Sequence, residues 1–271
     1  MVESLKELNL ICQKPNYKKV GNWMVRRILR DAALPVTWLL LHTPITANQV
    51  TFISLIVGLI GIVCFAFPAK SVFLIGALLL QLWYFLDHVD GQIARYRKTA
   101  SLSGRFFDFM THHVIHSVAF FSLGFYCLLV SGAAFFLVWG FLTSLGITLF
   151  NLTFDVKYKT FFERLVTAKT ITVESSATGS DFPLKRRGSF FRNAFSLCHK
   201  ISEVHVLMNI VTIAAFLQFF TPIPIDLRFL LFTLYGIVVP FITTTKIIYL
   251  ISAKKIDQEF NSLFVLHETR D

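Results

Sequence analysis

Charged side chains are scarce in this sequence. Aspartate, glutamate, lysine and arginine together make up 15% of the 271 residues, whereas 55% of the residues are hydrophobic and 30 are phenylalanine. A soluble globular domain carries about 25% charged residues. The composition therefore excludes an ordinary soluble fold and indicates an integral membrane protein.

Cysteine is also rare, and the four cysteines form no Cys-x-x-Cys pair. A disulfide framework or a thiolate metal site needs paired cysteines, so the sequence favours reduced structural thiols. The first thirty or so residues lack an apolar core between charged and small-residue flanks. We therefore expect no cleavable signal peptide.

Acidic residues are outnumbered, with 16 Asp and Glu against 26 Lys and Arg, and the formal net charge is +10. The basic residues are spread over several loops without a nucleic-acid-binding module, so we do not expect nucleic acid as a partner. We attribute the positive charge to membrane topology and to attraction to anionic lipid in the bilayer.

Six apolar runs approach the roughly 20 residues that a helix needs to span a bilayer. They predict an all-α integral membrane domain of six transmembrane helices over residues 45–251, with an N-terminal segment 1–44, a polar loop 155–200 and a C-terminal tail 252–271. The runs are Val50–Phe67, Val72–Ala94, Phe106–Val130, Ala133–Phe154, Ser202–Phe220 and Arg228–Ile251.

Lysine and arginine gather in alternate connections between these runs. Most lie in Met1–Arg30, Arg95–Arg105 and Lys157–Lys200, whereas the intervening connections hold only Lys70 and Arg228. By the positive-inside tendency, both termini and the long polar loop face the cytoplasm. The sequence thus predicts a multi-pass protein of the plasma or inner membrane.

Apolar and basic residues interleave just before the first run. Trp23 and Ile28 flank Arg26, which predicts an amphipathic helix lying at the interface of the inner leaflet, with its basic side chains toward the headgroups. We expect Thr46 or Asn48 to cap the first spanning helix.

Carboxylates and histidines lie between two strongly apolar runs, in the stretch DHVDGQIARYRKTASLSGRFFDFMTHHVIH. Asp87 and Asp90 are three residues apart and share one face of a helix, while Asp108, His112 and His116 follow at intervals of four and form a second stripe. The link between the two helices is short. We therefore expect adjacent antiparallel helices whose stripes face each other near the cytoplasmic surface.

Converging carboxylates would repel one another unless a cation lay between them. Oxygen ligands suit Mg²⁺ or Mn²⁺, and these ions commonly hold phosphate groups. Gly91 and Ala94 leave room for a bulky ligand, and glycine lets a backbone approach a substrate closely. Together these residues predict a metal-assisted phosphoryl site, although each feature taken singly is compatible with helix packing.

The same stretch resembles the signature of the CDP-alcohol phosphotransferase family, D-x2-D-G-x2-A-R-x8-G-x3-D-x3-D. The resemblance extends from about Ile45 to His112, and His112 stands where the family has its fourth aspartate. The positions that match in identity and spacing are Asp87, Asp90, Gly91, Ala94, Arg95, Gly104 and Asp108.

The resemblance implies a six-helix membrane enzyme, usually a homodimer, that acts in phospholipid biosynthesis. Such an enzyme takes a CDP-activated donor, most often CDP-diacylglycerol, passes the phospho-alcohol unit to an acceptor alcohol and releases CMP. The resemblance implies one or two divalent ions, Mg²⁺ or Mn²⁺, and a cytoplasmic active site. It assigns metal binding to Asp87, Asp90, Asp108 and His112, the base to position 112, and nucleotide binding to Gly91, Ala94, Arg95 and Gly104.

Histidine at position 112 leaves three interpretations open. His112 can act as the general base in place of aspartate. It can instead serve as a neutral metal ligand, which suits Zn²⁺, Mn²⁺ or Fe²⁺ better than Mg²⁺, or it can mark an inactive relative that binds CDP-lipid. We expect His116 to be a buried structural histidine, His113 to pack at the helix surface and His88 to have no role.

Two other classes of membrane protein use histidine and aspartate within the bilayer. The sequence HHVIH is similar to a histidine box of a membrane oxidoreductase, but the eight histidines form no further box. A metal transporter would not need Gly91, Ala94, Arg95 and Gly104 at the spacing of the phosphotransferase signature. Both classes are therefore weaker hypotheses than the transferase.

Overall fold

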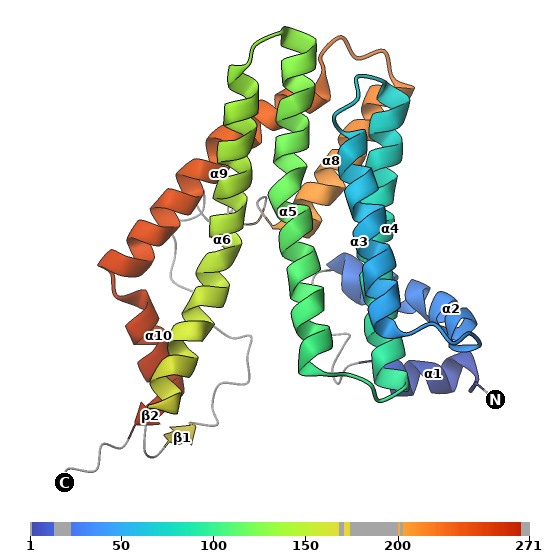
Figure 1. Ribbon diagram of the computed structural model, residues 1–271, viewed down its shortest axis with the longest axis vertical. Coiled ribbons are helices and arrows are strands. Elements are labelled where there is room, and N and C mark those ends of the chain that lie inside the picture. Colours follow the sequence, from blue (N-terminus) through green and yellow to red (C-terminus); the bar gives the residue numbers. More distant parts are fainter. Residues whose placement is uncertain (1, 14–22, 168–170, 174–199, 201–202, 267–271) are drawn as a thin grey trace.

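The computed structural model describes residues 2–13, 23–167, 171–173, 200 and 203–266, and their helices form an elongated bundle (Figure 1). The long helices are α3 (Ala47–Cys64), α4 (Lys70–Tyr96), α5 (Leu102–Ser131), α6 (Phe135–Val166), α8 (Val204–Phe220) and α9 (Leu227–Ser252). The shorter elements are α1 (Leu5–Cys12), the π-helix η1 (Val25–Leu29), α2 (Arg30–Leu41), α10 (Lys255–Leu263) and the strands β1 (Ile171–Val173) and β2 (Phe264–Leu266), which pair antiparallel.

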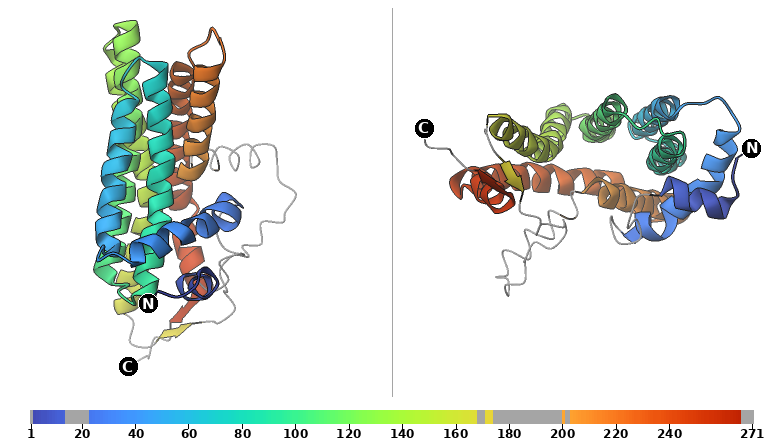
Figure 2. Two further views of the ribbon diagram at one scale, coloured as in Figure 1. Left: turned by 90° about the vertical axis from the view of Figure 1, so that its right-hand side faces the viewer. Right: turned by 90° about the horizontal axis from the view of Figure 1, so that it is seen from below.

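The long helices lie in two layers. Seen along the bundle, α3 to α6 form one layer, and α8 and α9 lie across one face of it (Figure 2). Accordingly α8 packs against α4, and α9 packs against α6 and α5. One end of the bundle carries α1, α2, α10 and the α4–α5 turn (Figure 1). This is the end that the sequence predicts to hold the site and to face the cytoplasm.

The prediction of an all-α membrane protein is confirmed. Five of these helices, α3, α4, α5, α6 and α9, are long and apolar enough to cross a bilayer. The fifth predicted span corresponds to α8, which is apolar but has only 17 residues. The described part of the chain thus contains six apolar helices, and the count of six full spans is approximate.

Glycines let the layer of four helices pack closely. A Cβ atom at Gly76 of α4 would lie 2.6 Å from the carbonyl oxygen of Gly61 in α3. A Cβ atom at Gly124 of α5 would lie 2.7 Å from the carbonyl oxygen of Phe136 in α6. Both distances are far below van der Waals contact, so these helix pairs depend on small residues in the way that is typical of membrane bundles.

Thr46 caps the first spanning helix, as the sequence predicts. Its side chain accepts from the amide of Gln49 at 3.3 Å, and the Gln49 side chain accepts from the amide of Thr46 at 2.8 Å. The predicted N-terminal helix is also present as η1 and α2, with Trp23 65% exposed and Ile28 47% exposed. Its position at a membrane interface stays a prediction, and α1 was not predicted.

The fourth spanning helix is longer than predicted. α6 continues to Val166, so residues 155–166 are helical rather than part of a loop. The amine of Lys157 lies 2.6 Å from a carboxylate oxygen of Glu259 in α10, and the rings of Phe161 and Phe260 meet at 5.2 Å. Through these contacts α10 packs against the extended end of α6. Residues 174–199 of the predicted loop lie outside the described residues.

Arg228 joins the start of α9 to the end of α3. Its side chain is buried, and it donates to the carbonyls of Phe67 and Pro68 at 3.0 and 2.9 Å. Asp226 lies 3.4 Å from its Nε atom, and the guanidinium stacks on the Tyr126 ring at 3.9 Å. The buried charge is therefore fully surrounded by partners, which a buried arginine requires.

We expect Arg228→Met to lower the apparent unfolding temperature of the purified protein by roughly 5–10 °C. The variant removes the charged donor to both carbonyls, and a hydrogen bond to a charged group contributes about 1.5–3 kcal/mol. Thermal unfolding in one detergent would measure the shift. Lys159→Gln, at a side chain that is 74% exposed, is the matched control. Equal melting of both variants and the parent would contradict a structural role.

Candidate active site

The turn between α4 and α5 is fixed by its own hydrogen bonds. The amide of Thr99 donates to the carbonyl of Ala94 at 2.9 Å, and Lys98 between them has φ 55°. This is the geometry of a Schellman motif, in which a left-handed residue ends the helix. Ser101 then caps α5 by accepting from the amide of Gly104 at 3.0 Å. The turn therefore holds the two helices in a defined register.

α4 and α5 meet through side chains rather than backbones. α3 packs against both helices, and α4 and α5 do not pack closely on each other within the described chain. The predicted adjacency therefore holds for the side chains of the two helices and not for their backbones. The facing stripes nevertheless meet: the rings of Trp83 in α4 and His112 in α5 are 5.0 Å apart.

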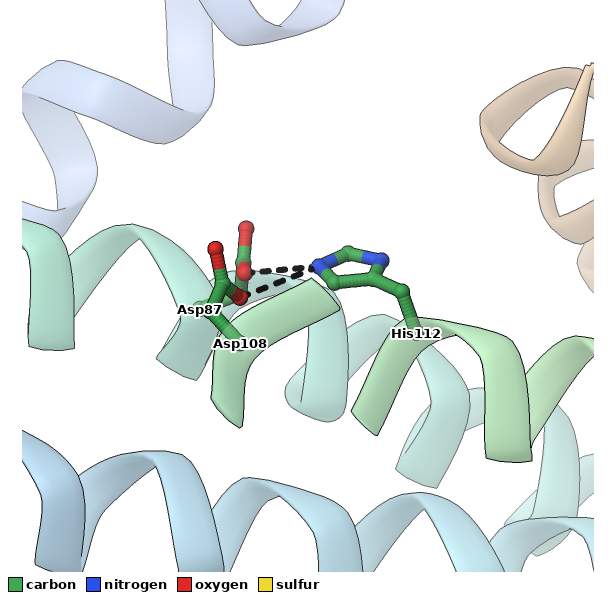
Figure 3. Close-up of side chains that lie close together, drawn as sticks. All are labelled: Asp87, Asp108 and His112. Atoms are coloured by element: carbon green, nitrogen blue, oxygen red, sulfur yellow. Dashed lines mark hydrogen bonds and ion pairs between the residues drawn. The ribbon is translucent and has the colours of Figure 1, made fainter. Parts of the chain in front are cut away.

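Asp87, Asp108 and His112 form a cluster (Figure 3). The Nε2 atom of His112 lies 2.9 Å from Oδ1 of Asp87 and 3.5 Å from Oδ1 of Asp108. One ligand atom from each residue can be chosen so that all three lie within 4.8 Å of one another. The other ring nitrogen of His112 points away from both carboxylates (Figure 3).

The donor set of this cluster fits a divalent cation. Two carboxylate oxygens and one imidazole nitrogen are ligands that Mn²⁺ accepts readily and that Mg²⁺ accepts in part. Oδ1 of Asp108 is buried and has no hydrogen-bond partner in the structure. A buried carboxylate oxygen without a partner is costly, so this atom is available for a ligand.

Asp90 lies one turn beyond Asp87 but is not a member of the cluster. Its Oδ2 atom accepts a hydrogen bond from the hydroxyl of Thr51 in α3 at 2.5 Å, and its side chain is buried. Asp90 does line the same cleft as Asp87 and Asp108. The structure thus brings together three of the four predicted metal ligands and holds the fourth against α3.

The neighbouring histidines have separate partners. Nδ1 of His88 lies 2.9 Å from the carbonyl of Tyr84 and 3.5 Å from Oδ2 of Asp87. His113 pairs with Asp155 of α6 at 2.8 Å, in keeping with a surface position. His116, expected to be a structural histidine, has its Nδ1 atom 3.2 Å from the side-chain nitrogen of Asn151.

A cleft of about 680 Å³ opens beside the cluster. Its lining residues come from the N-terminal segment, the start of α3, the end of α4 and the start of α5. A volume of this size can hold a nucleotide-sized ligand. The signature residues that line it are Asp87, Asp90, Gly91, Ala94, Arg95, Gly104 and Asp108.

Both glycines of the signature lie at crowded points of this cleft. A Cβ atom at Gly91 would lie 3.1 Å from a terminal nitrogen of Arg95. A Cβ atom at Gly104 would lie 3.3 Å from the side-chain oxygens of Asn48 and Ser101. Larger residues would therefore push polar side chains toward the space that a ligand needs.

Several residues of the cleft were not predicted from the sequence. Thr51, Gln92 and Arg30 line it, yet they lie on three different helices. A polar residue in an apolar run, such as Thr51, was the only available signal. His88 also lines the cleft, although the sequence gave it no role.

The chain matches a protein-family model. Residues 44–215 match the family model described as CDP-alcohol phosphatidyltransferase, which covers the signature and four of the long helices together with part of α8. No curated protein sequence matches the chain. The matched region exceeds half of the 271 residues, and the chain belongs to the CDP-alcohol phosphatidyltransferase family.

Proposed function

We propose that this protein transfers a phosphatidyl group from CDP-diacylglycerol to the hydroxyl of an alcohol, with release of CMP, as a step of phospholipid biosynthesis. Family membership indicates transfer from a CDP-alcohol donor. The observation that carries the proposal is the cluster of Asp87, Asp108 and His112, two of whose members line a nucleotide-sized cleft.

The proposed reaction exchanges a phosphoanhydride bond for a phosphodiester bond. The acceptor oxygen forms a bond to the phosphorus that carries the diacylglycerol unit, and the bond from that phosphorus to the oxygen of CMP breaks. The hydroxyl proton of the acceptor is released, and CMP leaves with the electron pair. The diphosphate is strongly anionic, so a site that holds carboxylates needs compensating positive charge.

Asp87, Asp108 and His112 would hold a divalent cation, with Asp90 one turn away as the further ligand that the signature implies. When bound there, Mg²⁺ or Mn²⁺ would neutralise charge on the diphosphate and on the departing phosphate oxygen. Oδ1 of Asp87 and Nε2 of His112 lie 2.9 Å apart, so both atoms could reach the same cation. Asp108 would contribute Oδ1, which faces Nε2 of His112 at 3.5 Å and has no hydrogen-bond partner among the described residues.

The remaining signature residues would form the nucleotide side of the cleft. Gly91, Ala94 and Gly104 leave space for the cytidine nucleotide, and Arg95 brings a guanidinium to the cleft wall. Guanidinium groups bind phosphate oxygens in a bidentate manner. The homodimer implied by the family stays a prediction.

His112 is proposed as a metal ligand rather than as the base. Only Nε2 faces the carboxylates, and a nitrogen lone pair that binds a cation cannot accept a proton at the same time (Figure 3). The cluster geometry favours the ligand role. The base role that the sequence predicts is the alternative outcome of the test in the Discussion.

The proposed function is tested by CMP release from CDP-diacylglycerol, using purified protein in lipid nanodiscs with a panel of alcohols. We expect release to require both an acceptor and Mg²⁺ or Mn²⁺, because the carboxylates cannot hold an anionic diphosphate without a cation. Excess chelator should stop the reaction, and added Mn²⁺ should restore it. Undiminished release in chelator would refute the metal-centred account.

We further propose that the site faces the cytoplasm, because the basic connections predict this orientation. Lys159→Cys places a thiol at an exposed position of α6, in a background without the native cysteines. A membrane-impermeant maleimide is expected to label it only after cells are permeabilised. Labelling of intact cells would reverse the orientation and separate the site from cytosolic nucleotide.

A further inference from the structure

The N-terminal helices form part of the cleft. Gln13, directly after α1, and Arg30, the first residue of α2, line it together with Gln92 and Arg95 of α4. The two sides belong to segments far apart in the sequence. The shape of the cleft therefore depends on how α1 and α2 are held against the end of α4.

Gln92 makes a buried connection between these segments. Its side chain is 1% exposed, and both the oxygen and the nitrogen of its amide make hydrogen bonds. Oε1 accepts from the hydroxyl of Thr37 in α2 at 2.7 Å, and Nε2 donates to the carbonyl of Arg30 at 2.8 Å. The signature accepts any residue at position 92, so this connection is a property of the present chain.

A second connection joins α1 to the same part of α4. Nε of Arg95 donates to the carbonyl of Cys12, and Nε2 of Gln13 donates to the carbonyl of Arg30 at 3.3 Å. Apolar side chains close the space between the helices. The buried members of this contact are Leu8, Cys12, Ala33, Leu34, Leu41, Val50, Val89 and Ile93.

We propose that Gln92 is a positioning residue for the CDP-linked donor: its amide ties α2 to α4 and so keeps Arg30 and Arg95 at the cleft. The proposal rests on the proposed function, since it assigns the cleft to a CDP-linked diphosphate. Gln92 acts through α2, and it does not contact the cluster of Asp87, Asp108 and His112 in the structure.

Thr37 allows the connection to be tested without altering the cleft. It is fully buried and does not line the cleft, whereas Gln92 does. Thr37→Val removes the hydroxyl and keeps the shape, and Gln92→Leu removes both hydrogen bonds. If Thr37 and Gln92 act through the hydrogen bond that joins them, the effects of Thr37→Val and Gln92→Leu on donor binding must not add.

The first measurement is steady-state CMP release from CDP-diacylglycerol in nanodiscs. We expect Gln92→Leu to raise KM for the donor roughly 10-fold and Thr37→Val to raise it less, because each leaves a buried polar group unpaired at a cost of about 1–3 kcal/mol. The value of kcat should change less than about 2-fold, and the double variant should resemble Gln92→Leu. Asp31→Asn, an exposed site on α2, should behave as the parent.

A reduced kcat with unchanged KM would overturn the proposal, as would additive effects or an unaltered KM in both variants. The first outcome would assign Gln92 to the chemical step, the second would indicate that Gln92 acts on the donor independently of Thr37, and the third would leave Gln92 without a part in donor binding.

The second measurement is the rate at which maleimide labels Cys12, which reports how firmly α1 is docked. Cys12 is retained as the only cysteine of the protein used. Burial raises the pKa of the Cys12 thiol to about 11, so the docked thiol reacts slowly with maleimide. We expect maleimide to label Cys12 faster in the Gln92→Leu variant than in the parent. We also expect that roughly 10-fold more CDP-diacylglycerol is needed to protect Cys12 of the variant from labelling.

This labelling does not depend on turnover. Protection without CMP release would contradict the proposed function while leaving the role of Gln92 supported. Equal labelling and equal protection in parent and variant would contradict the role of Gln92, whatever the activity.

Discussion

Asp87→Asn is expected to lower CMP release by roughly two to three orders of magnitude and to abolish tight Mn²⁺ binding. Asp87 makes the shortest contact of the cluster, 2.9 Å from Oδ1 to Nε2 of His112, and its Oδ2 atom lies 3.5 Å from Nδ1 of His88. The asparagine keeps the shape and removes the charge. Loss of one partner from a buried charged site costs about 3–5 kcal/mol, which corresponds to this fall in rate.

Binding and activity should be measured separately for this variant. Electron paramagnetic resonance of Mn²⁺ reports the metal directly, and CMP release reports turnover. Asp31→Asn, which removes an exposed carboxylate from α2, is the matched control. If Asp87→Asn bound Mn²⁺ as tightly as the parent, the cluster of Asp87, Asp108 and His112 would not be the metal site.

The spacing of the signature predicted a large part of this arrangement. Intervals of three and four residues place Asp87 with Asp90 on one helix face and Asp108 with His112 on another, because helical periodicity is local. Hydropathy located the ends of the apolar helices to within a few residues, apart from the C-terminal end of α6. Thr46 was identified as a cap because a capping box is also read from neighbouring residues.

Contacts between distant segments could not be predicted in this way. The hydrogen bond from Thr51 to Asp90 joins α3 to α4, and the contacts of Gln92 join α4 to α2. Neither pair shares a local pattern, since each depends on how helices pack. The extension of α6 to Val166 has the same origin, because α10 covers a segment that looks polar and loop-like by composition.

His112 replaces a carboxylate of the family signature, and a neutral imidazole ligand at this position would change the charge of the site by one unit. In the structure Nε2 of the ring faces both Asp87 and Asp108, and the ring packs edge-on against Trp83. Three roles are compatible with these contacts: metal ligand, general base and packing residue. The pH profile cannot separate the first two, because both need an unprotonated Nε2 and both predict loss of activity toward acid pH.

Metal dependence does separate them. If His112 is a ligand, His112→Ala should weaken Mn²⁺ binding about 10–100-fold or more, and high Mn²⁺ should restore part of the lost activity. His112→Asp should then bind Mg²⁺ more tightly than the parent, because a carboxylate suits that ion better than imidazole does. Exchange of Mn²⁺ for Mg²⁺ should consequently favour the aspartate variant in turnover.

If His112 is instead the base, His112→Ala should lower kcat by roughly 10²–10⁴-fold with Mn²⁺ affinity unchanged, and no concentration of metal should rescue it. A parent that binds CDP-diacylglycerol and releases no CMP with any alcohol would mark an inactive relative, and His112→Asp would then be the variant expected to gain activity. Mn²⁺ titrations and CMP release on the three proteins decide among these outcomes. Normal turnover and normal Mn²⁺ affinity in His112→Ala would contradict both chemical roles and leave the ring as a packing partner of Trp83.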